Sequence, residues 1–92
     1  MLDPQPLKGR TAIVTGSGQN IGEAIVKLFA NAGANVVVNG GSSQEKVDKV
    51  VADIRADGGN AIGVMADVGD ADAVAAMVNQ AAETFGTIEF DC

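Results

Sequence analysis

The residues best suited to chemistry form a glycine-rich loop. Gly16, Gly18 and Gly22 stand as G-x-G-x-x-x-G between a short apolar run and a helix-like pattern. Such a loop lets a strand turn sharply, lets its backbone approach a pyrophosphate, and aims helix N–H groups at the anion. Gly16 suits the sharp turn, and Gly22 allows the helix to pack closely on the strand. Gly18 keeps side-chain bulk out of the loop, while Ser17 and Gln19 add hydrogen-bonding groups. We interpret the loop as a dinucleotide site, although its spacing differs from the commoner G-x-G-x-x-G. The alternative is an ordinary glycine-containing turn.

Catalytic side chains are scarce in this sequence. It has no His, Tyr or Trp and one cysteine, Cys92, which excludes thiolate–imidazole zinc clusters and Ser–His–Asp or Cys–His catalysis within the chain. Ser42 or Ser43 with Lys46 or Lys49 gives a Ser/Lys spacing, which we interpret as solvated residues at a helix start. We therefore predict binding chemistry without catalytic residues and without a metal site.

Composition narrows the class of protein and its partners. The 92 residues, 47% hydrophobic, suffice for one small domain, and the hydrophobic content excludes disorder. A net charge of −6 with six scattered basic residues argues against nucleic acid as a partner. No apolar stretch approaches the roughly 20 residues that span a bilayer, so no membrane partner is expected. The first ten residues lack the features of a signal peptide, and a cytoplasmic location is expected.

Hydrophobic spacing predicts strands that alternate with helices. Strands are expected at 11–15, 35–39 and 61–67, with the start of a fourth at 87–90. The helices between them are expected to bury three apolar faces: Ile21, Ala24, Ile25, Leu28, Phe29 and Ala32; Val47, Val50, Val51 and Ile54; Val74, Met77, Val78, Ala81 and Phe85.

Capping residues and the order of the elements predict the helix ends and the fold class. Asn20 is a candidate N-cap of the first helix and Asp70 or Asp72 of the third, while Gly33 and Gly86 suit the positions just past helix ends. The fold class is α/β: a partial Rossmann, doubly wound parallel sheet in the order β-α-β-α-β-α plus the start of a fourth strand. Residues 1–92 are expected to form one incomplete NAD(P)-binding Rossmann domain, of which 1–9 are an irregular lead-in.

The stretch "TGSGQNIGEAI" resembles the cofactor loop of the short-chain dehydrogenase/reductase family, whose pattern is T-G-x-x-x-G-x-G. Thr15, Gly16 and Gly22 match marked positions, and Asn20, which tolerates positive φ, replaces the middle glycine. "ADV" at 66–68 is similar to the family's adenine-binding site, and the resemblance extends over about residues 8–90. Its implied cofactor-binding residues are Gly16, Ser17, Gly18, Gln19, Asn20, Ile21, Gly22, Asn39, Ser42, Ser43, Asp67 and Val68, with Asp67 on the adenine amino group and Val68 near the ring.

The end of the second strand bears on the choice of cofactor. NAD sites usually carry an acid about 20 residues beyond the loop, but counting from Gly22 reaches Gly40 and no carboxylate. Asn39, Ser42 and Ser43 could donate hydrogen bonds to a 2′-phosphate, and Lys46 could help if the turn brings it near. No Arg lies in this segment to clamp the phosphate. The sequence favours NADP over NAD as the cofactor.

The resemblance also sets the expected function. It implies NAD(P)-dependent oxidoreduction of an alcohol or carbonyl. The family's catalytic Ser and Tyr-x-x-x-Lys are absent from this chain. We therefore expect the chain to be a cofactor-binding N-terminal portion that is inactive alone. A short fourth strand would leave 11–15 as an open edge, so marginal stability and self-association through that edge are expected. The alternatives are a non-catalytic nucleotide-binding or interaction module and one half of a split enzyme. The substrate is not encoded here.

Overall fold

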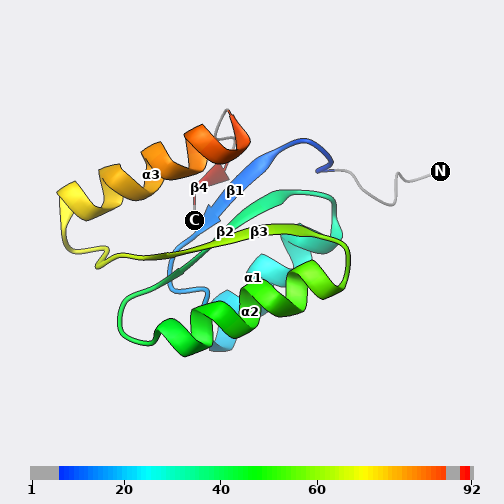
Figure 1. Cartoon of the computed structure of the whole chain (residues 1–92), viewed down its shortest axis with the longest axis horizontal. Coiled ribbons are helices and arrows are strands. Elements are labelled where there is room, and N and C mark those ends of the chain that lie inside the picture. The colour runs from blue at the N-terminus through cyan, green and yellow to red at the C-terminus, as the bar shows by residue number, and fades with distance from the viewer. Residues whose placement is uncertain (1–6, 87–89, 92) are drawn as a thin grey trace.

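Four parallel strands form one sheet in the order β3-β2-β1-β4 (Figure 1). The computed structural model describes residues 7–86 and 90–91. The strands are β1 (Thr11–Val14), β2 (Asn35–Gly40), β3 (Asn60–Met65) and β4 (Phe90–Asp91). The predicted alternation of strands and helices in a parallel sheet is confirmed, with the first and third strands ending one and two residues earlier than expected. Residues 87–89, part of the predicted fourth strand, lie outside the described residues.

The helices cover the two faces of the sheet unequally (Figure 1). Helices α1 (Asn20–Asn31) and α2 (Gln44–Ala56) lie on one face and α3 (Ala71–Phe85) on the other. The chain steps outward from β1 to β3 and then returns across the sheet to β4. Right-handed crossovers in opposite directions place their helices on opposite faces, so the direction of winding reverses between β1 and β4.

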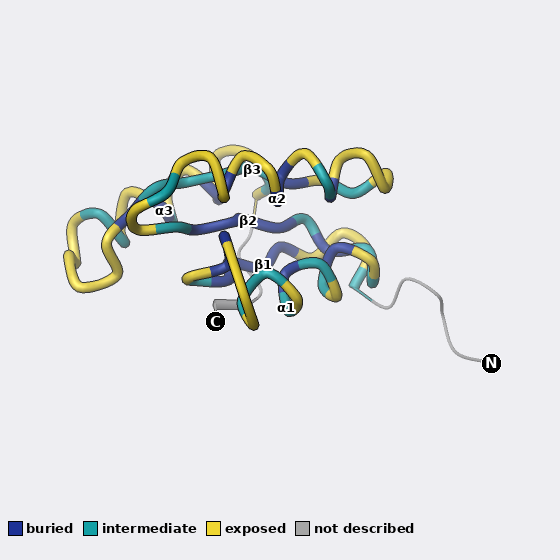
Figure 2. Tube along the Cα trace, turned by 90° about the horizontal axis from the view of Figure 1, so that it is seen from below, coloured by how far each residue is buried: buried dark blue, intermediate teal, exposed yellow. Residues whose placement is uncertain are grey.

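The core consists of two apolar layers, one on each face of the sheet. Valines of β2 alternate between them: Val36 and Val38 pack beneath α1 and α2, whereas Val37 packs beneath α3 with Ile13 and Met77. Figure 2 accordingly shows β1 and β2 as largely buried tubes between helices whose outer turns are exposed. Burial on both faces explains why these strands read as continuous apolar runs.

The predicted buried face of α1 is wrong by about one residue of rotation. Ile21 and Leu28 are 77% and 66% exposed, whereas Val26 and Ala30 are buried. This helix is apolar on almost every side, so spacing alone allows two candidate faces. The contact of Gly22 with the preceding loop selects the face that runs through Ile25, Val26, Phe29 and Ala30.

Helices α2 and α3 follow the sequence pattern closely. All four predicted apolar residues of α2 are buried, and in α3 Met77 and Ala81 are buried. Asp70 caps α3, accepting hydrogen bonds from the N–H groups of Asp72 and Ala73, and Gly86 follows the helix with a φ of +89°. The prediction of Asn20 as the N-cap of α1 is wrong, because Gln19 holds that position.

Strand β4 covers part of the edge that the sequence left open. It pairs with β1 at Ala12 and Ile13, so these two residues are not an open edge. Self-association through the sheet edge therefore stays a prediction. Within the described residues, no helix is both long and apolar enough to cross a membrane.

Candidate cofactor site

The glycine loop lies where the winding direction of the sheet reverses. It leaves the carboxyl end of β1, which has β2 on one side and β4 on the other. Crevices outside the carboxyl ends of parallel strands, at such a reversal, are where open α/β sheets bind ligands. The topology thus places the predicted dinucleotide loop at the expected position in the fold.

Two residues of the loop adopt left-handed backbone conformations. Gly16 has a φ of +64°, and Asn20 has a φ of +57°, the only positive value of a non-glycine residue in the described part of the chain. Asn is among the side chains that best tolerate this region, so it can stand where a glycine is usual. The loop therefore completes its turn despite the departure from the family pattern.

Gly22 lets α1 begin directly against the loop. A Cβ added to Gly22 would lie 2.3 Å from the Gly16 carbonyl oxygen and 2.9 Å from the Ser17 Cα. Side chains are therefore excluded at Gly22, as the sequence predicted for close helix packing. The contact draws the first turn of α1 and its N–H groups toward the loop.

A hollow of about 70 Å³ lies between the glycine loop and the start of α2. Lys46 reaches it from the first turn of α2, and its Nζ donates a hydrogen bond to Gln19 Oε1 of the loop. Ser43 caps α2 by accepting a hydrogen bond from the Lys46 N–H. The structure thus brings five predicted residues and Lys46 together at this hollow: Gly16, Gly18, Gln19, Ser42, Ser43 and Lys46.

Asn39 and Ser17 require a correction, because neither side chain is free to contact a cofactor. Asn39 is 1% exposed: its Oδ1 accepts from the Gly16 N–H, and its Nδ2 donates to the carbonyls of Val64 and Ala66. Ser17 is fully buried, with its hydroxyl hydrogen-bonded within the protein. Asn39 lies beneath the loop, and Ser17 is a loop residue whose side chain points into the protein. Both Nδ2 hydrogen bonds of Asn39 are taken by carbonyl oxygens, so this geometry leaves no hydrogen bond from Asn39 to a 2′-phosphate.

The remaining predicted residues lie exposed at the carboxyl edge of the sheet. Asn20 and Ile21 stand at the start of α1, and Asp67 and Val68 follow β3. The Asp67 carboxylate accepts a hydrogen bond from the Gly69 N–H at 2.8 Å, and Val68 is 58% exposed. Asp67 and Val68 do not line the hollow itself, and their contact with adenine stays a prediction.

Sequence reasoning missed three residues that line the hollow. These are Gly40, Gly41 and Val47. A Cβ on Gly40 would lie 2.5 Å from Val47 Cγ2, so the absence of a side chain at Gly40 leaves room for Val47. The apolar spacing of α2 predicted that Val47 is buried, but it could not show that Val47 packs against Gly40.

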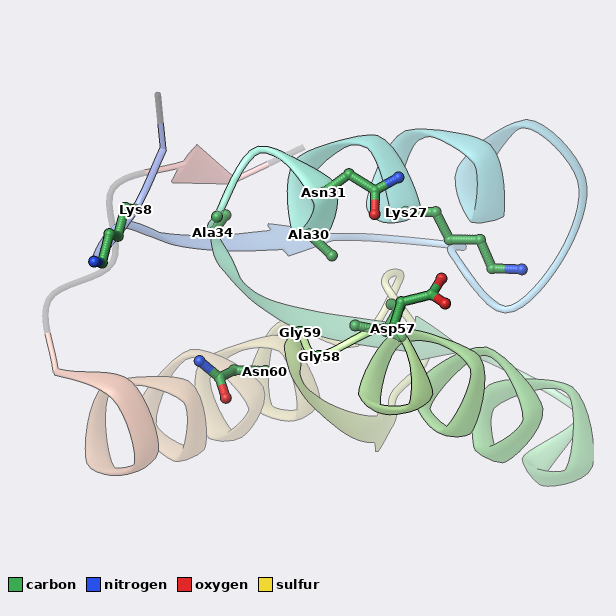
Figure 3. A pocket seen from close by; sticks show the side chains of 11 residues that line it. Lys8, Lys27, Ala30, Asn31, Ala34, Asp57, Gly58, Gly59 and Asn60 are labelled. Carbon is green, nitrogen blue, oxygen red and sulfur yellow. The ribbon is translucent and has the colours of Figure 1, made fainter. Parts of the chain in front are cut away.

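A second, larger cavity of about 270 Å³ lies at the other end of the strands, beside the starts of β2 and β3. Lys8 and Asn60 stand toward one end of it and Lys27 and Asp57 toward the other (Figure 3). It adjoins the C-terminal ends of α1 and α2, whose partial negative charge disfavours phosphate, and Asp57 adds a carboxylate. Phosphate chemistry therefore points to the smaller hollow at the helix N-termini.

Lys27 near this cavity is already paired. Its Nζ lies 2.6 Å from Glu23 Oε2 on the same helix and 3.2 Å from Asp53 Oδ2 on α2. The hydrogen bond to Glu23 raises the pKa of Lys27 above its usual 10.5, against a smaller opposing effect of desolvation, and Asp53 adds to the rise. Lys27 therefore joins α1 to α2, and most of its charge is balanced within the protein.

Comparison with known proteins identifies relatives of a single family. The family model described as short chain dehydrogenase matches residues 10–90. The chain is 46% identical over 87 residues to a versicolorin reductase of Emericella nidulans, covering 95% of this chain and 33% of the relative. It is 42% identical over 91 residues to a probable tetrahydroxynaphthalene reductase of Zymoseptoria tritici, covering 99% and 34%.

Solved structures share the fold as well as the sequence pattern. A short-chain dehydrogenase/reductase from Serratia marcescens superposes with a TM-score of 0.90 at 35% identity, covering 94% of this chain and 35% of that one. The chain thus spans about a third of the length of the relatives it matches.

Proposed function

Because this chain belongs to the short-chain dehydrogenase family, we propose that it forms the NADP-binding portion of an oxidoreductase acting on an alcohol or a carbonyl. The bound nicotinamide would supply or accept hydride. We assign binding, and no proton transfer, to the residues of this chain, since it contains no Tyr or His. The two fungal relatives are named as reductases, which supports the reducing direction.

The start of α1 is the observation that carries this proposal. Ser43 and Asp70 cap α2 and α3 with their side chains, whereas Gln19 makes no side-chain cap to α1. The first N–H groups of a helix have no partner within the helix and favour an anion. With Gly16 left-handed and Gly22 without a side chain, the loop fits a pyrophosphate at this helix terminus.

The hollow beside the loop supports NADP over NAD. Gly40 occupies the region where NAD sites carry an acid, and even a Cβ there would displace Val47. Lys46, Ser42 and Ser43 surround the hollow at the N-terminus of α2, and its dipole favours a phosphate. We propose that Lys46 pairs with the 2′-phosphate, exchanging its hydrogen bond to Gln19 for one to the anion.

Adenine would occupy the edge next to β3. Asp67 is exposed there, with one carboxylate oxygen on the Gly69 N–H, and it would accept a hydrogen bond from the adenine amino group. Val68, more than half exposed, would cover the ring. Ile21, 77% exposed at the start of α1, offers a further apolar contact to the cofactor.

Calorimetric titration with NADPH and NADH tests the proposal. A charge-assisted hydrogen bond contributes roughly 1.5–3 kcal/mol, so Lys46→Met should weaken NADPH binding about 10- to 100-fold and leave NADH binding nearly unchanged. Lys49→Met, an exposed lysine one turn further along α2, is the matched control and should change neither affinity.

Two results would contradict the proposal. A folded protein that binds neither dinucleotide refutes the cofactor site altogether. Equal losses for NADPH and NADH in Lys46→Met refute the assignment of Lys46 to the 2′-phosphate, and NADP preference with it.

A further inference from the structure

Asn39 joins the glycine loop to β3 through its side chain. Oδ1 accepts a hydrogen bond from the Gly16 N–H at 3.0 Å, and Nδ2 donates to the carbonyl oxygens of Val64 and Ala66 at 3.2 Å each. The side chain is almost completely buried. One amide thus spans from the loop that follows β1 to the end of the third strand.

The backbone of Asn39 holds the next two loop residues. Its N–H donates to Ser17 Oγ at 2.9 Å, and its carbonyl accepts from the Gly18 N–H at 3.2 Å. The Ser17 hydroxyl in turn donates to the Val14 carbonyl at 2.6 Å. Three consecutive loop residues, 16 to 18, are therefore fixed to a single position of β2.

Asn suits this position because it offers an acceptor and two donors in one plane. An Asp would keep the acceptor for Gly16 but place a carboxylate against the carbonyls of Val64 and Ala66. An apolar side chain would leave the Gly16 N–H and the carbonyls of Val64 and Ala66 without this partner. The loss is most costly at Ala66, where the hydrogen bond is fully buried. The hydrogen-bond set at Asn39 can be satisfied only by an amide oriented as it is here.

The two ends of this amide meet different halves of the site. Gly16 belongs to the loop proposed for the pyrophosphate, and Ala66 directly precedes Asp67, proposed for adenine. We infer that Asn39 is a positioning residue that sets the distance and orientation between the pyrophosphate and adenine subsites. This inference rests on the proposed function. Asn39 itself does not touch the cofactor.

Two ligands of different length separate positioning from general stability. NADPH occupies both subsites, whereas adenosine 2′-monophosphate occupies only the adenine side. In a folded Asn39→Asp variant, affinity for NADPH should fall at least 10-fold and affinity for the monophosphate no more than about 3-fold. A merely structural role would lower the melting temperature and leave the ratio of the two affinities unchanged.

Asn60→Asp provides a matched control. It makes the same chemical change at an exposed amide, whose Nδ2 donates to Asn35 Oδ1 at 3.1 Å. Asn60 and Asn35 stand at the starts of β3 and β2, at the end of the strands away from the glycine loop. Both affinities should stay within about 2-fold of the unsubstituted protein. Circular dichroism of each variant before titration establishes that the folded state is being compared.

Each outcome decides the inference. An unchanged affinity ratio in folded Asn39→Asp overturns it, while binding by the unsubstituted protein leaves the proposed function standing. Absence of NADPH binding by the unsubstituted protein overturns the proposed function instead, and the inference with it. If Asn39→Asp does not fold, Ser17→Ala is tested instead, because it removes the hydroxyl that links Val14 and Asn39. A selective loss of NADPH affinity in this variant supports the inference. An unchanged ratio of the affinities for NADPH and the monophosphate overturns it.

Discussion

Gly22, in the first turn of α1, lies so close to Gly16 that a Cβ would come within 2.3 Å of the Gly16 carbonyl oxygen. The helix and the loop are therefore packed backbone against backbone. This contact fixes which face of α1 is buried and aims the helix N-terminus at the loop. The geometry of the cofactor site and the packing of the core depend on the same pair of glycines.

Gly22→Ala should destabilise the protein and weaken dinucleotide binding. Gly→Ala in a helix interior ordinarily stabilises by roughly 0.5–1 kcal/mol, but here the methyl group meets backbone and we expect a net loss of about 1–3 kcal/mol. Urea unfolding measures this directly. Gly41→Ala is the control, since its Cβ would meet only the Ala66 carbonyl oxygen at 4.0 Å, and its stability should be nearly unchanged. A Gly22→Ala variant more stable than the unsubstituted protein would contradict the close packing.

Gly40 and Val47 should show energetic coupling. Gly40→Ala places a methyl group 2.5 Å from Val47 Cγ2 and should cost about 1–3 kcal/mol through overpacking. Val47→Ala alone should also destabilise, because it removes two buried methyl groups. The double variant should lose less than the sum of the two, by at least about 0.5 kcal/mol. Additive losses in a double-mutant cycle would show that the two residues do not compete for space.

Asp70→Ala should shorten or loosen α3. The carboxylate accepts from the N–H groups of Asp72 and Ala73 at 3.0 and 3.3 Å, and loss of such a cap costs about 1 kcal/mol. Glu83→Ala, near the C-terminus of the same helix, removes an acid from the negative end of the dipole and should be neutral or slightly stabilising. Equal losses for the two variants in denaturant unfolding would exclude the capping role.

Lys27 should contribute stability that disappears at high pH. Its pKa is raised in the folded protein by the hydrogen bond to Glu23, so the folded state binds this proton more tightly than the unfolded state. The contribution is complete below the unfolded value near 10.5 and falls as pH rises through the folded value.

The matched comparison for this pH dependence is Lys27→Met. The side chains involved are about one-third or more exposed, so the pair contributes only about 0.5 kcal/mol. The difference in unfolding free energy between the unsubstituted protein and the variant should shrink above pH 10.5. A difference that stays constant up to pH 12 would contradict the ion pair as its source.

Sequence reasoning succeeded where local pattern and packing agree. The valines of β2 and the apolar period of α2 predicted buried elements because each pattern allows one buried arrangement. The face of α1 was misplaced because Ile21 and Leu28 are as apolar as the buried residues. Only a contact from outside the helix, that of Gly22 with Gly16, distinguishes the two faces.

The loop of the site could be predicted from local sequence, whereas the role of Asn39 could not. Glycine positions and the Asn20 conformation follow from local backbone requirements, which the loop sequence displays. Asn39 was assigned to the cofactor because its amide, at the end of the second strand, could donate a hydrogen bond to a 2′-phosphate. Its partners lie 23 to 27 residues away along the chain, so its supporting role depends on the folded arrangement of three strands.

The common direction of α1 and α2 has a kinetic consequence. Both helices begin at the glycine-loop edge, so a chain with a net charge of −6 presents two helix N-termini and Lys46 to an anionic ligand, with the acids Glu23 and Glu45 in the same first turns. At long range the net charge repels a dinucleotide, whereas Lys46 and the helix termini attract it at contact. Physiological salt limits long-range forces to about 8 Å. Raising ionic strength from low values should therefore speed association while it also speeds release, so the arrival and the residence of the ligand respond to salt in different ways.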